Sequence, residues 1–428
     1  MKVFLQTLGC KVNQYETQAM ETLLAARGHT VSTESDGCDV CIVNTCAVTA
    51  ESGRKSRQTI RHLREKNPDA VIGVCGCYSQ ISPEDANALN ADVVFGSSDR
   101  AAFLVAVENA FLTRQRVCQV DDALRRRSFE SLPAGNLAGR TRALLKIQDG
   151  CCNFCSYCVI PYARGPVRSL PLTQSAEEAR LLGEKGYREI VLTGIEIASY
   201  GKDFKEKATL ADAVCLVSEN APGARLRLGS LEPRIVTEEF CARLSALPNL
   251  CPHFHLSLQS GCDETLKRMR RKYDSDRFFR SVQLLRRFFP ACGLTADLIV
   301  GFPGETEEEF QKTLSFIQKC SFSSMHIFPY SPRPGTPAAA MDGQIPNAVK
   351  KARAAEAALV MKAMRETFLI SCTGTVQQVL FEQEIAGKCS GHAGNYCRVT
   401  VRGTGLHNKV FPVKITGHGQ DFLIGVLI

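Results

Sequence analysis

Short apolar segments alternate with amphipathic ones along most of this 428-residue chain. In residues 1–112 the apolar segments have the length of β-strands, and they read KVFLQT, DVCIVNT, AVIGVCG and DVVFG. Helical patterns separate them, one from Asn13 to Gly28 and another over residues 49–66. Strands that alternate with helices are joined by right-handed crossovers. This region is therefore predicted to be an α/β domain built on a parallel sheet.

The alternation stops over residues 113–140, which contain an arginine triplet and a Pro-Ala-Gly turn and are predicted to be a linker. It resumes over residues 141–368 with six strand patterns: RALLKIQ, REIVLTG, RLRLGSLEP, HFHLSLQSG, LTADLIVGFPGE and SSMHIFPYSPRPGT. Such a series predicts a partial β/α barrel, in which chemistry takes place at the carboxyl ends of the strands. A long helix near residues 347–370 is expected to close this domain.

Residues 369–428 carry short strand patterns divided by glycines: GTVQQVLFEQ, YCRVTV, KVFPVKIT and DFLIGVLI. They predict a third domain, a small β-barrel. The chain as a whole is thus expected to be of the α/β class with an added carboxy-terminal barrel.

Composition indicates the cellular compartment and the kinds of partner that the chain is expected to have. No stretch approaches the ~18 uninterrupted apolar residues of a membrane span, so no membrane association is expected. The amino terminus turns polar without a cleavage site, which favours the cytoplasm. A formal net charge of +8 is compatible with a nucleic-acid partner. The chain has 20 cysteines, and because a reducing compartment disfavours disulfides, metal binding is their leading use.

Three cysteines of the first domain, Cys10, Cys46 and Cys77, each follow a predicted strand directly. The carboxyl ends of parallel strands meet at one edge of a sheet, where ligands gather. These cysteines are therefore expected at one edge of the first sheet. The alternative is that each thiol packs beneath a loop and binds no ligand.

A second group of cysteines lies in GCCNFCSYC, at the end of the first barrel strand. Structural zinc sites usually need a second cysteine pair farther along the chain, and none matches here. Cys151, Cys155 and Cys158 could hold a 4Fe-4S cluster and leave one iron without a protein ligand. Cys152, Cys155 and Cys158 form an equally acceptable set, so spacing alone leaves both sets open.

The segment GCCNFCSYCVIPYARG resembles the signature of the radical S-adenosylmethionine (SAM) methylthiotransferases. That resemblance implies that Cys151, Cys155 and Cys158 hold a 4Fe-4S cluster whose open iron binds SAM. Tyr157 would be the aromatic residue of the signature, and Cys152 would have no role. The barrel would then be of the radical SAM type.

The resemblance extends to both ends of the chain. QTLGCKVNQYET, VNTCAVT and GCYSQ are similar to the family's amino-terminal domain, whose cysteines hold an auxiliary 4Fe-4S cluster. It implies Cys10, Cys46 and Cys77 as those ligands, with Cys75 as a bystander. The carboxy-terminal region resembles the TRAM domain, a small RNA-binding barrel.

The family resemblance also implies which barrel residues border SAM and substrate. VLTGIEIASYG, LSLQSG and DLIVGFPGET are similar to family segments around this site. The cofactor-binding residues expected from it are Tyr157, Gly194, Glu196, Glu232, Gln259, Asp297 and Gly301.

Basic and aromatic residues suggest where RNA could bind. Arg54, Arg57 and Arg61 share one helix face, which could contact a phosphate backbone or simply face solvent. A denser basic segment follows the fourth barrel strand and is expected to contact substrate phosphates through Lys267, Arg268, Arg270 and Arg271. Asn395 and Tyr396 could contact RNA, or they could be a turn and a core tyrosine.

The function that the resemblance implies is transfer of a methylthio group to carbon 2 of N6-threonylcarbamoyladenosine at tRNA position 37. Reduction of the barrel cluster by a low-potential electron donor would cleave SAM to a 5′-deoxyadenosyl radical, which activates a carbon-hydrogen bond. Two alternatives remain: methylthiolation of isopentenyl-adenosine in tRNA, and a non-enzymatic metal-containing RNA-binding protein.

Overall fold

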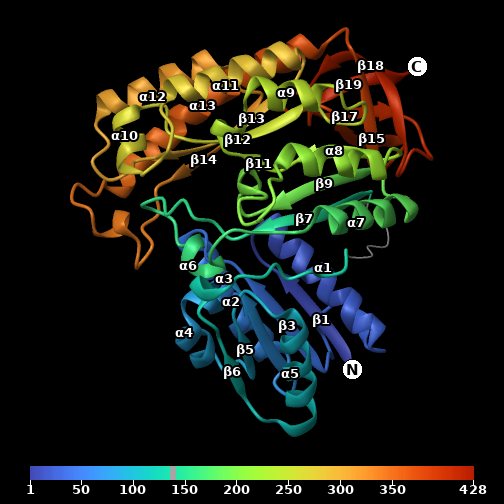
Figure 1. Cartoon of the computed structure of the whole chain (residues 1–428), viewed down its shortest axis with the longest axis vertical. Coiled ribbons are helices and arrows are strands. Elements are labelled where there is room, and N and C mark those ends of the chain that lie inside the picture. The colour runs from blue at the N-terminus through green and yellow to red at the C-terminus, as the bar shows by residue number, and fades with distance from the viewer. Residues whose placement is uncertain (135–140) are drawn as a thin grey trace.

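The computed structural model describes residues 1–134 and 141–428 (Figure 1). The end of the predicted linker, residues 135–140, lies outside the described residues. The amino-terminal domain forms one end of the molecule, and the central half-barrel and the small carboxy-terminal barrel lie side by side at the other. Among the described helices, none is both long and apolar enough to cross a membrane.

The amino-terminal domain contains the expected parallel sheet, with the strand order β2-β1-β3-β4-β5-β6. Its strands are β1 (Lys2–Thr7), β2 (Thr30–Ser32), β3 (Val40–Thr45), β4 (Val71–Gly76), β5 (Val93–Phe95) and β6 (Val117–Gln119). Its helices are α1 (Lys11–Ala26), α2 (Ala50–Lys66), α3 (Cys77–Ile81), α4 (Pro83–Ala88) and α5 (Arg100–Thr113). Because β6 pairs with β5, the sheet extends beyond the predicted domain boundary at residue 112.

The sheet has a separate apolar core on each face. Met20 and Leu24 of α1 and Phe103 of α5 pack on one face. Ile60 of α2 and Tyr78 of α3 pack on the other, together with residues from the segment that follows the second cysteine group. The amino-terminal domain and the half-barrel therefore share a core.

The central domain is a half-barrel of mainly parallel strands flanked by helices (Figure 1). Its strands are β7 (Arg142–Asp149), β8 (Arg168–Ser169), β9 (Glu189–Gly194), β10 (Arg225–Leu228), β11 (Ser230–Leu231), β12 (His253–Gln259), β13 (Gly293–Val300) and β14 (Ser324–Pro329). Its helices are α6 (Ile160–Arg164), α7 (Leu172–Glu184), α8 (Leu210–Asn220), α9 (Glu238–Ser245), α10 (Asp263–Arg268), α11 (Ser275–Phe288), α12 (Glu307–Cys320) and α13 (Asn347–Cys372).

One predicted barrel strand is interrupted. The segment RLRLGSLEP forms β10, which pairs with β9, and β11, which pairs with β12. Gly229 separates them, so the half-barrel consists of two four-stranded sheets that meet at this residue. The other predicted strands and the closing helix α13 lie where the sequence pattern places them.

The carboxy-terminal domain is a closed barrel with the strand order β15-β16-β17-β19-β18. The strands are β15 (Val376–Ile385), β16 (Lys388–Ala393), β17 (Arg398–Arg402), β18 (Val410–His418) and β19 (Leu423–Leu427). The sequence did not predict β16. Its buried positions are Cys389, Gly391 and Ala393, and such small residues leave a weak apolar alternation.

Two arginines of the half-barrel bind the carboxy-terminal barrel, and a buried carboxylate holds both of them in place. Glu189 of β9 accepts from Arg227 at 2.8 Å and from Arg225 at 2.5 Å. These arginines also donate to carboxy-terminal carbonyls, Arg227 to Gly394 at 2.9 Å and Arg225 to Gln378 at 2.9 Å. Burial alone would raise the pKa of Glu189, but the arginines hold it well below its ordinary value.

Replacing Glu189 with glutamine should lower the free energy of unfolding by about 3–5 kcal/mol, because buried arginines would lose their counter-charge. Urea denaturation at neutral pH would measure this loss. The depressed pKa means that the stabilisation is present above the ordinary carboxylate pKa and disappears as pH falls through the folded value. Glu177→Gln, on the exposed face of α7, is the matched control and should change nothing measurable. Equal stability of both variants would contradict this role.

Candidate metal centres

The structure brings Cys10, Cys46 and Cys77 together at the carboxyl edge of the amino-terminal sheet. They follow β1, β3 and β4, whose parallel pairing places these strand ends side by side. Burial raises the pKa of the Cys77 thiol, Arg164 opposes that rise and Cys10 adds to it. The pKa of Cys46 is also raised, first by burial and then by the neighbouring Cys77. Each thiol therefore lies within electrostatic range of another.

Glycine makes room for this first cysteine group. Gly9 has a φ of +101°, and a Cβ atom there would lie 2.7 Å from the Sγ atom of Cys46. A side chain at Gly9 would thus collide with the side chain of Cys46. The donor set fits a cluster, because thiolates are the usual ligands of iron-sulfur centres.

Cys75 does not belong to this group. Its side chain is fully buried with Val3 and Phe103 on the opposite face of the sheet from Cys77. Burial raises the pKa of its thiol to about 12. This placement agrees with the prediction that Cys75 is a bystander.

The second cysteine group occupies the loop between β7 and α6. Burial raises the pKa of Cys158 to about 12, and the neighbouring thiols that add to this rise are Cys155 and Cys151. Cys152 is exposed, whereas Cys155 is buried. The thiols of Cys151, Cys155 and Cys158 are thus near one another, which supports this set over the one that contains Cys152.

Arg271 lies against the second cysteine group, where the sequence analysis had predicted a phosphate contact. Its side chain donates to the Sγ atom of Cys155 at 3.2 Å and to the hydroxyl of Tyr273 at 3.1 Å. Arg268, for which a phosphate contact is also expected, pairs with Glu309. Lys267 and Arg270 are exposed and stay available to a polyanion.

The predicted SAM residues lie around the carboxyl ends of the barrel strands. Gly194 ends β9, Gln259 ends β12 and Gly301 follows β13. Glu196 and Glu232 follow the neighbouring strands and are close enough that Glu232 contributes to the raised pKa of Glu196, after burial. Among the described side chains, the Oε1 atom of Glu196 is buried without a hydrogen-bond partner, as expected where a polar ligand would bind.

Asp297 and Tyr157, the two remaining predicted cofactor residues, and Gly301 contact other groups of the protein. Asp297 lies within β13 and pairs with His255 at 3.2 Å. The ring of Tyr157 packs edge-on against Phe302, at 6.3 Å between centroids. The backbone N–H of Gly301 donates to Glu305 at 2.8 Å.

The arginines of α2 keep one exposed face. Arg54 pairs with Glu51 on the surface, and Arg61 is exposed. Arg57 lies over the ring of Tyr78, at 5.8 Å. This face is open to a partner.

Asn395 and Tyr396 form part of the junction between two domains. Asn395 is 2% exposed, and its side-chain oxygen accepts from the backbone N–H of Cys397 at 3.1 Å. Tyr396 stacks on His253 at 4.7 Å and on His392 at 5.1 Å. The side chain of Asn395 is therefore inside the protein, which favours the alternative that it is part of a turn.

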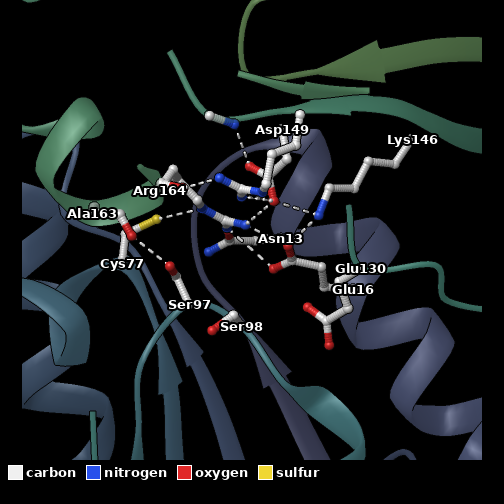
Figure 2. Close-up of polar contacts among 12 residues, drawn as sticks. Asn13, Glu16, Cys77, Ser97, Ser98, Glu130, Lys146, Asp149, Ala163 and Arg164 are labelled. Atoms are coloured by element: carbon white, nitrogen blue, oxygen red, sulfur yellow. Dashed lines mark hydrogen bonds and ion pairs between the residues drawn. The ribbon is translucent and has the colours of Figure 1, made fainter. Parts of the chain in front are cut away.

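A buried charge network contacts the amino-terminal cysteine group through Arg164, and the sequence patterns do not predict it (Figure 2). Glu16 of α1 accepts from Arg100 at 2.7 Å, from Lys146 of β7 at 2.9 Å and from Arg164 of α6. Burial alone would raise the pKa of Glu16, but these three cations hold it well below its ordinary value. One signal in the sequence could have indicated this network. The helix and strand patterns assign some ionisable residues to the core, where a charged side chain needs a partner.

Two family patterns match this chain. Residues 145–317 match the radical SAM superfamily, and residues 2–96 match the uncharacterized protein family UPF0004. These ranges correspond to the half-barrel and to most of the amino-terminal domain. A 4Fe-4S cluster and SAM are the cofactors that the superfamily implies.

A relative covers the chain from end to end. The threonylcarbamoyladenosine tRNA methylthiotransferase MtaB of Bacillus subtilis is 38% identical over 434 residues, which are 100% of this chain and 96% of the relative. The chain belongs to the radical SAM methylthiotransferase family. MtaB of Thermotoga maritima is 42% identical to this methylthiotransferase over 82% of the chain and 80% of the relative. The non-enzymatic alternative is thereby set aside.

A second kind of relative and a solved structure are also similar to this methylthiotransferase. The tRNA-2-methylthio-N(6)-dimethylallyladenosine synthase of Bacillus subtilis is 33% identical over 90% of the chain and 76% of the relative. The radical SAM methyltransferase TsrM of Kitasatospora setae superposes with a TM-score of 0.59 at 15% identity, covering 91% of this chain and 77% of TsrM. That superposition shows the fold alone.

Proposed function

We propose that this methylthiotransferase transfers a methylthio group to carbon 2 of N6-threonylcarbamoyladenosine at position 37 of tRNA. The observation that carries the proposal is the presence of two separate cysteine groups in one chain, one at the carboxyl edge of the amino-terminal sheet and one in the loop between β7 and α6. The similarity to the MtaB relatives, at 35–42% identity, supports the choice of nucleoside. A tRNA substrate would place the enzyme in the cytoplasm.

Each cysteine group would hold its own 4Fe-4S cluster. Cys10, Cys46 and Cys77 would be the ligands of the auxiliary cluster. Cys151, Cys155 and Cys158 would be those of the barrel cluster. With SAM bound and an external low-potential donor, these cofactors supply the radical and sulfur chemistry that unreactive carbon requires.

The protein's own contribution is to bind and orient. The carboxyl ends of the barrel strands would hold SAM, with the unpartnered Oε1 atom of Glu196 available to a polar group of the ligand. The side chain of Arg271 would orient Cys155 by its hydrogen bond to the thiolate. The tRNA backbone would contact Lys267 and Arg270, which follow β12, and the exposed face of α2.

Nucleoside mass spectrometry of tRNA from cells with and without this gene tests the function. Loss of the 2-methylthio form of threonylcarbamoyladenosine, with the unmethylthiolated nucleoside accumulating, is the expected result. Loss of the 2-methylthio form of isopentenyl-adenosine would assign the other substrate instead. An unchanged profile, in cells shown to express the protein, would contradict both.

A further inference from the structure

Arg164, the last residue of α6, reaches from the half-barrel into the amino-terminal cysteine group (Figure 2). Its side chain is fully buried, and its Nε–H donates to the Sγ atom of Cys77 at 3.2 Å. The residue follows Cys158 by six positions in the chain. One side chain therefore joins the loop of one cysteine group to a sulfur atom of the other.

The guanidinium group has little freedom to turn away from that sulfur. One of its amino groups donates to the Oδ1 atom of Asn13 at 2.6 Å and to Glu16 at 3.1 Å, and the other also donates to Glu16. Asn13 is itself held by its donations to the carbonyls of Leu8 at 2.8 Å and Thr45 at 2.9 Å. The Nε–H is thus fixed in its direction before any cofactor binds.

The helix that carries Arg164 is fixed as well. The backbone N–H of Cys151 donates to the carbonyl of Gly165 at 3.0 Å, which closes the cysteine loop. Ser97, at the edge of the amino-terminal sheet, donates to the carbonyl of Ala163. A structural change at either cysteine group would therefore alter the position of Arg164.

A hydrogen bond to a ligand sulfur changes the cluster that the sulfur binds. It withdraws negative charge from the thiolate, and hydrogen bonds to the sulfurs are among the factors that set cluster reduction potentials. The effect is larger in a buried site, where the low dielectric strengthens each interaction. The cation adds to it, because a positive charge favours the more negative, reduced state.

We propose that Arg164 is a positioning residue that raises the reduction potential of the auxiliary cluster by its hydrogen bond to Cys77. The inference rests on the proposed function, which supplies the cluster. A residue of the half-barrel would then set the reduction potential of the cluster in the amino-terminal domain. A purely structural ion pair between the domains would leave the potential unchanged.

The test compares auxiliary-cluster potentials by redox titration followed by electron paramagnetic resonance. A Cys155→Ala/Cys158→Ala background removes two ligands of the barrel cluster, so that the auxiliary cluster of the full-length chain is titrated alone. At a fixed potential, Arg164→Met should lower the ratio of reduced to oxidised cluster at least tenfold, a shift of about −59 mV for one electron. Arg164→Lys, which keeps the charge, should restore part of this shift.

Arg100→Met is the matched control, because Arg100 is equally buried and bonds the same carboxylate of Glu16 at 2.7 Å. None of the hydrogen bonds described for Arg100 reaches a cysteine. We expect this variant to change the ratio less than threefold. A shift as large as that of Arg164→Met would overturn the proposal, since charge alone would then explain both.

Unchanged potential in Arg164→Met with about four irons per chain bound would also overturn it. Glu16 keeps Arg100 and Lys146 in that variant, so the network should still fold. If the methionine variant loses its iron, Arg164→Lys and Arg164→Gln decide: neither carries the Nε–H that donates to Cys77, so the potential should fall in both, and further in the glutamine variant, which also loses the charge. A shift in neither would reject the proposal. Absence of any cluster in the unsubstituted background would instead reject the proposed function.

Discussion

Replacing Cys155 with alanine is expected to abolish SAM cleavage, whereas replacing Cys152 is expected to leave it intact. Cys155 is buried and receives a hydrogen bond from Arg271, while Cys152 is exposed. Residues that only hydrogen-bond to metal ligands already cost 10–100-fold when replaced. Loss of a ligand should therefore reduce cleavage by more than about 100-fold. The measurement is 5′-deoxyadenosine formation after anaerobic reconstitution and reduction with dithionite.

The two variants control each other, since they remove the same atom from neighbouring positions of one loop. Iron analysis separates a lost cluster from a lost fold: Cys152→Ala should keep about eight irons per chain and Cys155→Ala about four. Cys151→Ala is the deciding third variant. Retention of cleavage in Cys151→Ala together with its loss in Cys152→Ala would mean that Cys152 is the ligand.

Strand periodicity and parallel topology were enough to predict where the first cysteine group lies. Cys10, Cys46 and Cys77 follow separate strands, and the carboxyl ends of parallel strands meet at one edge without any knowledge of side-chain packing. The half-barrel was predictable for the same reason. The interruption at Gly229 was not, because a single glycine in an apolar run does not reveal which neighbours its two halves pair with.

The charge network could not be predicted, because its partners are far apart in sequence. Arg164 and Glu16 are separated by 148 positions, and no local pattern relates them. In the basic segment after β12, the run of cations alone does not reveal which side chains face solvent. Its backbone turns at Arg270, where φ is +57°, and Arg271 then faces the cysteine loop while Lys267 stays in solvent.

Gly9→Ala is expected to remove the auxiliary cluster while sparing the barrel cluster. The backbone at Gly9 has a φ of +101°, and the new Cβ would lie 2.7 Å from both the Cβ and the Sγ atoms of Cys46. The strained conformation alone costs about 1–3 kcal/mol. Relief of the contact requires the side chain of Cys46 to leave its position in the cysteine group. Iron content should fall from about eight to about four per chain.

Gly28→Ala separates backbone strain from the steric effect on the cysteines. Gly28 has a φ of +80°, but a Cβ there meets nothing within 4 Å. This control should lose some stability and keep its full iron content. In Gly9→Ala, 5′-deoxyadenosine should still form, because the barrel cysteines are untouched, while methylthiolated tRNA should not. Full iron content and normal tRNA product in Gly9→Ala would show that Cys46 does not need the space that this glycine leaves, and would remove the strongest steric argument for the first cysteine group as a cluster site.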